Sequence, residues 1–467
     1  MDEAVSASGA VLLLPPALTL HVFGLLPVDA RACAACVSRA WCSALADWQL
    51  WTRLDLSPSS GVRVFVNDTV LLGATAKARS QLVALDVSDC EYLSRDALLT
   101  AVRTHGGTLR ELRCGASVDT YQTLDTDALR RLLQAAPLLT VCEAALLGAC
   151  NVPEVRRMLR GEPPFEQLRL RALCVNFVSG HRRTREETAN SRSVAVIGLA
   201  AELGTHAWLK QLALINAYKN DHSADEDAVD DASATAAIDA VVDAALVRGL
   251  ESIRFVDCKL IPDFLPALAR LVNGGTLTSL TIVQHHYMFD APSMALFADA
   301  VRASSALTTL VMCGLVVHGE SERIPVLLGA LTGHHSMRTL CILGHFNGQP
   351  CGTDEMGGTL GALVAANARA LTELDVSQMR LGDAVVRPLL DALAVNTHLR
   401  VLNISDNDLS ADFSRDVLLP AIHANTGLRQ LSATQWGFDP PNDNDCDRAR
   451  SWQWAELAVA QRLWEEE

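Results

Sequence analysis

The chain has 467 residues, of which 49% are hydrophobic and 20% are charged, a balance that predicts an ordered protein rather than a disordered one. Its net charge of −15 argues against binding to nucleic acid or to an anionic membrane surface, because both require a basic footprint. The 13 cysteines are scattered along a long chain, which favours reduced thiols and a cytoplasmic or nuclear location.

The apolar run of residues 10–26 does not have the pattern of a signal peptide. It follows Asp2 and Glu3 without any Lys or Arg, and Pro15 and Pro16 interrupt it. No other stretch approaches the roughly eighteen apolar residues that a membrane span requires. We therefore expect no membrane partner.

Residues 14–54 predict three short helices. Pro15 suits the first turn of a helix, Pro27 ends that helix, and Asp29 can cap the next one. The apolar positions follow at helical spacing: Leu18, Val22 and Leu25 or Leu26, then Cys33, Val37, Trp41 and Leu45, and finally Leu50, Trp51 and Leu54. Helices this short bury too little surface to be stable alone, so their apolar excess predicts a partner.

These residues resemble an F-box. The resemblance rests on the spaced Leu-Pro pairs, on Asp29 and on a Val-Ser-Arg-x-Trp segment, with Ala17 and Ala30 standing where the family commonly has an acid and a leucine. It implies a helical adaptor that docks on Skp1 or a Skp1-like protein and, through it, on a cullin. The implied contact residues are Leu14, Pro15, Leu18, Val22, Phe23, Leu26, Pro27, Val37, Ser38, Arg39, Trp41, Leu50 and Trp51. The alternative is a helical cap on the rest of the chain.

From about Leu82 onward the sequence repeats the unit Leu-x-x-Leu-x-apolar. Its period-2 ending predicts a short strand, and the apolar stripe that follows predicts a helix. The clearest copies begin at Leu82, Leu209, Leu250, Leu277, Leu307, Met337, Leu371 and Leu399, with weaker copies at Leu109, Leu138, Phe165 and Leu428. One strand and one helix cannot bury both faces, so neighbouring units must stack.

This periodicity resembles the leucine-rich repeats of the ribonuclease-inhibitor type. The fold class that we predict is α/β: an N-terminal three-helix F-box and then a leucine-rich-repeat horseshoe solenoid, with a parallel concave sheet and outer helices. Cys90, Cys258 and Asn407 stand where the family has a buried Asn or Cys, whose side chain would hydrogen-bond the backbone of a neighbouring loop.

The predicted boundaries follow from these patterns. Residues 1–8 are an N-terminal tail, 9–56 the F-box, 62–440 the repeats, and 441–467 a C-terminal linker and capping helix. Insertions near 176–193 and 216–236 interrupt the repeats, and the second holds an acidic loop at 221–231. Loops of this length are either functional or disordered, and we interpret both as solvated insertions.

No motif in the sequence indicates catalysis. A phosphate-binding Gly-x-x-x-x-Gly-Lys loop is absent, and Cys33-x-x-Cys36 lacks a second ligand pair at zinc spacing. The adjacent histidines at 285–286 and 334–335 point in opposite directions on a strand or loop and make poor chelates. We therefore expect no enzyme activity, no cofactor and no metal site.

The outward positions of the predicted strands offer a lightly apolar, mostly uncharged concave surface that suits a protein partner. Its polar and charged groups lie on the later repeats, and we interpret Arg254, His285, His286, Tyr287, Glu373, Asp375 and Asn403 as candidate substrate-binding residues. The function that the sequence favours is a substrate receptor of a Skp1–cullin–F-box ubiquitin ligase, which binds an unidentified protein target. The alternatives are a non-catalytic repeat scaffold or inhibitor, or a GTPase-activating protein.

Overall fold

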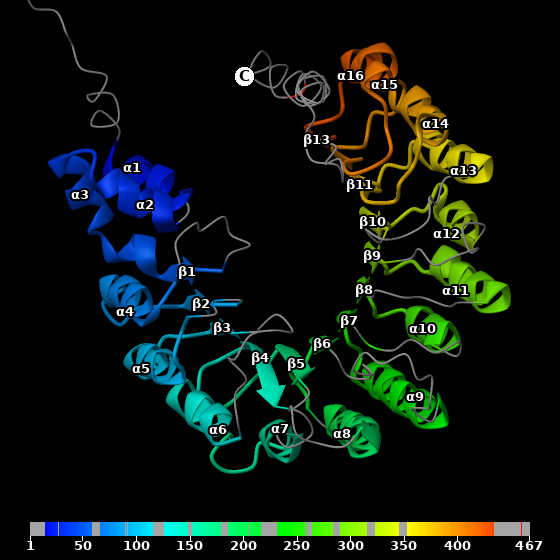
Figure 1. Cartoon of the computed structure of the whole chain (residues 1–467). Coiled ribbons are helices and arrows are strands. Elements are labelled where there is room, and N and C mark those ends of the chain that lie inside the picture. The colour runs from blue at the N-terminus through cyan, green and yellow to red at the C-terminus, as the bar shows by residue number, and fades with distance from the viewer. Residues whose placement is uncertain are drawn as a thin grey trace, which may run out of the picture. The chain divides into compact units, whose positions relative to one another are not determined.

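A computed structural model of the chain describes residues 15–26, 28–57, 66–88, 90, 92–114, 126–147, 152–178, 185–204, 206–215, 231–256, 258, 264–283, 290–314, 323–344, 353–433 and 459. The chain forms two compact units, residues 1–215 and residues 216–467. Figure 1 labels the helices and strands of both.

The first unit begins with short helices and continues as strand–helix repeats (Figure 1). The short helices are α1 (Pro16–Gly24), α2 (Val28–Ala35), α3 (Arg39–Leu45) and the 3-10 helix η3 (Trp48–Trp51). The repeats comprise β1 (Arg53–Asp55), α4 (Asp68–Lys77), β2 (Ala84–Asp86), α5 (Arg95–His105), β3 (Glu111–Cys114), α6 (Thr126–Ala135), β4 (Val141–Leu147), α7 (Val152–Leu159), β5 (Ala172–Val178), α8 (Arg185–Leu203) and β6 (Gln211–Ile215).

The second unit repeats the same strand–helix pair. Its elements are α9 (Asp231–Arg248), β7 (Ser252–Val256), α10 (Phe264–Asn273), β8 (Ser279–Val283), α11 (Ala291–Ala303), β9 (Thr309–Cys313), α12 (Arg323–Leu331), β10 (Thr339–Leu343), α13 (Asp354–Ala365), β11 (Glu373–Asp375), α14 (Asp383–Leu393), β12 (Val401–Asn403), α15 (Ala411–Phe413), a π-helical turn (Ser414–Leu418), α16 (Leu419–Ala424) and β13 (Gln430–Ser432). Helices α10–α14 lie along one side of strands β7–β11 (Figure 1).

Within each unit the strands pair in parallel and in chain order, and the leucine period explains why. Leu371, Leu374 and Val376 are all at most 6% exposed, and Leu374 pairs with Leu340 of β10 and Leu402 of β12. Burying equivalent side chains in successive repeats builds one continuous core. The predicted α/β leucine-rich-repeat fold is confirmed.

At the C-terminal ends of the strands, buried polar side chains form a ladder of hydrogen bonds with the backbone groups of the turns. The side-chain amide of Asn407 donates to the carbonyl oxygens of Val376 and Ile404, each at 3.0 Å, and its oxygen accepts from the N–H groups of Met379 and Leu381. Cys90 donates from its Sγ to the carbonyl oxygen of Leu56, in the preceding repeat, at 3.3 Å. The prediction that these positions bond neighbouring loops is confirmed for both. The Sγ of Cys258 instead donates to the carbonyl of Val256, two residues before it, at 3.4 Å.

A second ladder, which the sequence did not reveal, lies between the helices and the following strands. Asn396 donates to the carbonyl of Val364 in the preceding repeat at 2.8 Å and accepts from the N–H groups of His398 and Leu399. His334 occupies the equivalent position: its Nε2 lies 2.9 Å from the carbonyl oxygen of Val301, and its Nδ1 accepts from an N–H three residues later. A side chain that bonds in both directions therefore links consecutive repeats here.

The structure corrects the register of the repeat predicted to begin at Leu138. Leu139 and Cys142 are at most 1% exposed, whereas Leu138 is only half-buried, and Cys142 pairs with Leu112 of β3. The repeat therefore begins one residue later. Two adjacent leucines fit the pattern equally well, and a one-residue shift moves every strand side chain to the other face.

The repeat predicted to begin at Phe165 is also displaced. The residues of that frame, 165–170, precede strand β5, in which Leu173 pairs with Cys142. Phe165 and Leu168 are nevertheless buried, because the turn before the strand packs its own apolar side chains inward. Apolar spacing alone did not distinguish this turn from a strand.

Several predicted boundaries differ from the structure. Strand β1 begins at Arg53, so the repeats start inside the range 9–56 rather than at residue 62. Helix α8 starts at Arg185, so residues 185–193 of the first predicted insertion are helical. In the second insertion, residues 231–236 belong to α9, and residues 221–230 of the acidic loop lie outside the described residues. So do residues 1–8 and, apart from the buried Val459, residues 441–467.

The N-terminal helices pass directly into the first strand. Trp51 ends η3, Leu54 lies at the centre of β1, and both are 2% exposed. The N–H of Leu56 donates to the carbonyl oxygen of Asp86 at 2.9 Å, which extends the pairing of β1 with β2. Within the described ranges, no helix combines the length and apolar character needed to cross a membrane.

Candidate functional site

Local sequence signals set the ends of the N-terminal helices. Pro15 precedes α1, which begins with a second proline, where a missing N–H has no cost. The hydroxyl of Ser38 caps α3 by accepting from the N–H of Trp41 at 3.2 Å. The carboxylate of Asp47 caps η3 by accepting from the N–H of Gln49 at 2.9 Å. These helices are too short to be stable without tertiary packing.

That packing is aromatic. Phe23 is 2% exposed and contacts Trp41 edge to face, with ring centroids 5.4 Å apart. The indole N–H of Trp51 donates to the carbonyl oxygen of Leu45 at 2.8 Å. The Nζ of Lys77, on α4, lies 3.9 Å from the centre of a Trp51 ring. Trp51 therefore joins the N-terminal helices to the first repeat.

Arg31 of α2 is the polar centre of this interior. It is 9% exposed, and its Nε donates to the carbonyl oxygens of Phe23 at 3.1 Å and Leu26 at 2.8 Å. Its two terminal nitrogens donate to the carbonyls of Gly24, at 2.9 Å, and Leu50. Desolvation lowers the pKa of Arg31, yet a guanidinium stays protonated in proteins. Sequence reasoning missed this residue, because a single arginine on a short helix fits a solvent-facing position equally well.

Several large apolar side chains of this N-terminal segment remain exposed. Leu18, Val22 and Leu25 are 50%, 41% and 73% exposed and lie on the same side of α1, because they are four and three residues apart. Val37, in the turn between α2 and α3, is 61% exposed. We call these four residues the apolar stripe. Four exposed large apolar side chains between residues 18 and 37 are unusual for a surface without a partner.

Comparison with protein families decides the identity of this segment: residues 11–57 match the family model described as F-box-like. These residues form an F-box-like domain. No curated protein matches the chain. Among solved structures, it is similar to the one titled "Crystal structure of Rad7 and Elc1 complex in yeast", with 16% sequence identity over 85% of this chain and 89% of that one and a TM-score of 0.41.

The structure sorts the predicted contact residues of the F-box-like domain into three groups. Pro15, Leu18, Val22, Val37 and Arg39 are exposed, and Leu26, Ser38 and Trp41 are half-buried. Phe23, Leu50 and Trp51 are buried in this chain, so we reassign them from direct contact to internal packing. Leu14 and Pro27 lie outside the described residues. Leu25 joins the candidate surface, and only helical periodicity could have indicated it.

The predicted substrate residues that the structure describes lie on the face of the second unit's sheet opposite its helices. Arg254 on β7 and Glu373 on β11 are exposed, whereas Asp375 on β11 and Asn403 on β12 are half-buried. The side-chain amide of Asn403 donates to the carboxylate of Asp375 at 2.9 Å. Residues 285–287 lie outside the described part of the chain. The structure therefore brings Asp375 and Asn403 together and leaves Arg254 on a separate strand.

Internal contacts hold Asp375 in place. One of its carboxylate oxygens accepts from the N–H of Ser377 at 3.0 Å and from its hydroxyl at 2.7 Å, and the other accepts from Asn403. Glu373 is held less firmly, by one hydrogen bond from the hydroxyl of Thr339 at 3.0 Å. Of the two acids on β11, Glu373 is therefore the one that is available to a partner.

Within the described residues, no group of three or more His, Cys, Asp or Glu side chains could hold a metal ion. The structure thus offers two candidate surfaces: one apolar stripe on the F-box-like domain, and one sheet face with charges at separate strands.

Proposed function

We propose that this chain is the substrate-recognition subunit of a Skp1–cullin–F-box ubiquitin ligase. The observation that carries the proposal is the apolar stripe on the F-box-like domain. Its four side chains are exposed although Phe23, Leu50 and Trp51 of the same segment are buried, and a Skp1-like adaptor would cover them. The adaptor would in turn connect the chain to a cullin.

The chain's part in such a ligase is positional. The F-box-like domain would hold the adaptor, and the sheet face of the second unit would hold a protein target. Keeping the target near a ubiquitin-loaded enzyme raises the effective concentration of the two reactants, often to millimolar levels or above. We assign no chemical step to the chain's own residues.

The alternative function, a repeat scaffold whose N-terminal helices only cap the solenoid, has one observation in its favour. Trp51 of the F-box-like domain is buried and contacts Lys77 on α4 of the first repeat. This contact uses a buried side chain, whereas the side chains of the apolar stripe are exposed. The two roles are therefore compatible, and only the adaptor role explains the stripe.

The proposed location is the cytoplasm or nucleus, where such ligases act. None of the cysteines in the described ranges forms a disulfide bond. Reduced thiols are expected in both compartments.

The test is a binding measurement between the full-length chain and a purified Skp1-type adaptor. Replacing Leu18 and Val22 together with Asp places two charges in the proposed interface and should weaken binding by at least about 100-fold, since each buried apolar anchor contributes about 2 kcal/mol or more. The matched control is Val395→Asp, because Val395 is 70% exposed and lies in the second unit.

The control variant should bind the adaptor as the parent does. Circular dichroism and a melting curve establish that the double variant is folded. If the folded double variant keeps the parent's affinity, or if the parent itself does not bind, the adaptor role is wrong.

A further inference from the structure

The strand register of the second unit aligns its outward side chains in three rows. The first row, which we call the hydroxyl row, consists of Ser252, Ser279, Thr309 and Thr339 on β7–β10. The third, which we call the apolar row, consists of Val256, Val283, Cys313 and Leu343 on the same strands. All eight side chains are half-buried, so they form a continuous floor rather than isolated projections.

The charges of this face lie at its two ends. The middle row runs Arg254, Thr281, Val311, Cys341 and Asp375, and the hydroxyl row continues to Glu373. No charged residue stands in the three rows on β8, β9 or β10. Four strand spacings separate Arg254 on β7 from Glu373 on β11, which is about 19 Å.

The two ends cannot neutralise each other. A separation of about 19 Å exceeds the screening length of about 8 Å at physiological ionic strength. Arg254 and Glu373 therefore act as separate electrostatic contacts of opposite sign on an uncharged floor. Such an arrangement attracts a partner with the complementary pair of charges and repels one with two like charges.

The dimensions of the face favour a helix as the occupant. The hydroxyl and apolar rows are four residues apart along each strand, about 13 Å, which is close to the width of a helix with its side chains, about 10–12 Å. An extended segment is about 5 Å wide and would cover a single row. A helix spans about 19 Å in about 13 residues.

We propose that this face binds an amphipathic helix of a protein partner, with its apolar side on the apolar row. The helix carries one acidic residue that meets Arg254 and one basic residue, 14 positions away, that meets Glu373, because residues 14 apart lie on nearly the same side of a helix and about 21 Å apart along it. This inference rests on the proposed function in one respect, because it describes the target segment that the receptor would recognise. A polyanion is a poorer occupant, since the chain has a net charge of −15.

Three synthetic helical peptides test the proposal. Each has about sixteen residues and the same leucine face, and they differ only at two positions 14 residues apart, which hold Glu and Lys, two Glu, or two Lys. Fluorescence anisotropy gives their affinities for the parent protein and for Arg254→Glu and Glu373→Lys. These two residues suit charge reversal because both are exposed.

The parent should bind the mixed peptide best. Arg254→Glu should prefer the peptide with two Lys, and Glu373→Lys the one with two Glu, with a change of roughly two- to fivefold for each matched charge. The control is Arg302→Glu, a reversal on helix α11, which should keep the parent's preference. Leu343→Asp, once shown to be folded, should lose binding to all three peptides.

The proposal would be overturned if the parent and the three charge-reversal variants ranked the peptides in the same order. It would also be overturned if the parent bound none of the three peptides. Sedimentation provides a further check: a parent dimer that Leu343→Asp dissociates would mean that a second copy of this chain covers the face, and would also overturn it. Adaptor binding, measured on the same variants, separates this inference from the proposed function. Loss of the adaptor role with the peptide preferences intact would leave the face as a helix-binding surface.

Discussion

Replacing Arg31 with Met should destabilise the F-box-like domain by about 2–4 kcal/mol. The guanidinium bonds four backbone carbonyls, those of Phe23, Gly24, Leu26 and Leu50. Hydrogen bonds to a charged group contribute about 1.5–3 kcal/mol each, so four of them give an upper bound of about 6–12 kcal/mol. The net loss is smaller than this bound for two reasons. Burying the guanidinium in the parent already costs several kcal/mol of desolvation, and the released carbonyls regain water in the variant.

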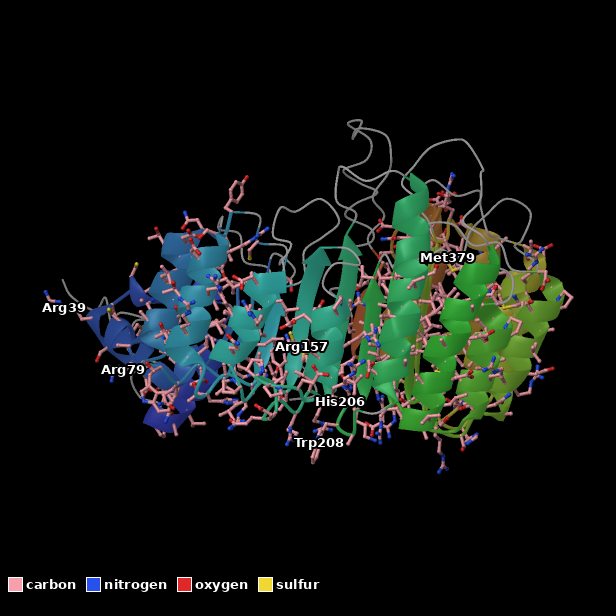
Figure 2. All side chains as sticks on the ribbon, turned by 90° about the horizontal axis from the view of Figure 1, so that it is seen from below. Arg39, Arg79, Arg157, His206, Trp208 and Met379 are labelled. Atoms are coloured by element: carbon pink, nitrogen blue, oxygen red, sulfur yellow. The ribbon has the colours of Figure 1, made fainter. Side chains whose placement is uncertain are left out.

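Hydrogen exchange of the backbone amides in residues 16–51 measures this loss directly. Amides that exchange through opening of the whole domain should exchange roughly 30- to 900-fold faster in Arg31→Met, since about 1.4 kcal/mol corresponds to a factor of ten. Arg39→Met is the matched control, because Arg39 is exposed and extends away from the ribbon in Figure 2. Equal exchange rates in Arg31→Met and the parent would refute the role of Arg31 as the centre of the domain.

Three further predictions concern the repeats. Leu374→Ala should lower the free energy of unfolding by about 2–5 kcal/mol, as expected for a fully buried leucine. An unchanged midpoint in a denaturant titration would contradict the place of Leu374 in the core. Asn407→Ala should lower the free energy of unfolding by about 2–4 kcal/mol, because the backbone groups that bond the Asn407 side chain would lose their partner. Its melting temperature should therefore fall. Burial lowers the pKa of His334, so its stabilising contribution is complete above the unfolded pKa of about 6.5 and is lost as the pH falls below that value. Denaturation midpoints at about pH 8 and about pH 5 should differ less in His334→Asn, which copies Asn396, than in the parent; an equal difference would contradict the assignment.

The leucine period predicted the repeats well because burial of equivalent side chains is what stacks them. Leu374 illustrates this, since its register follows from spacing alone and the strand pairing agrees. The same rule was wrong at Leu138 and Leu139, where two neighbours satisfy the pattern and only pairing with β3 decides between them. Register is therefore predictable where one leucine is available and undetermined where there are two.

The F-box-like domain was recognisable from its residue types, but the direction of each side chain was not. Val22 and Phe23 are adjacent in the sequence, yet Val22 is 41% exposed and Phe23 only 2%. The packing of Phe23 against Trp41 decides between them, and that contact depends on how α1 and α3 cross. For Arg31, no local pattern could have indicated burial, because the four carbonyls that it bonds come together only after folding.

The uninterrupted passage from Trp51 into β1 affects how the two proposed activities can be separated experimentally. Truncation before residue 58 would remove β1 together with the helices and leave β2 (Ala84–Asp86) as an unprotected sheet edge. Such an edge is a template for aggregation. A truncated chain that no longer captures a target would therefore have lost its solubility as well as its adaptor. Substitutions at Leu18 and Val22 leave that edge paired, so they provide the cleaner separation of function.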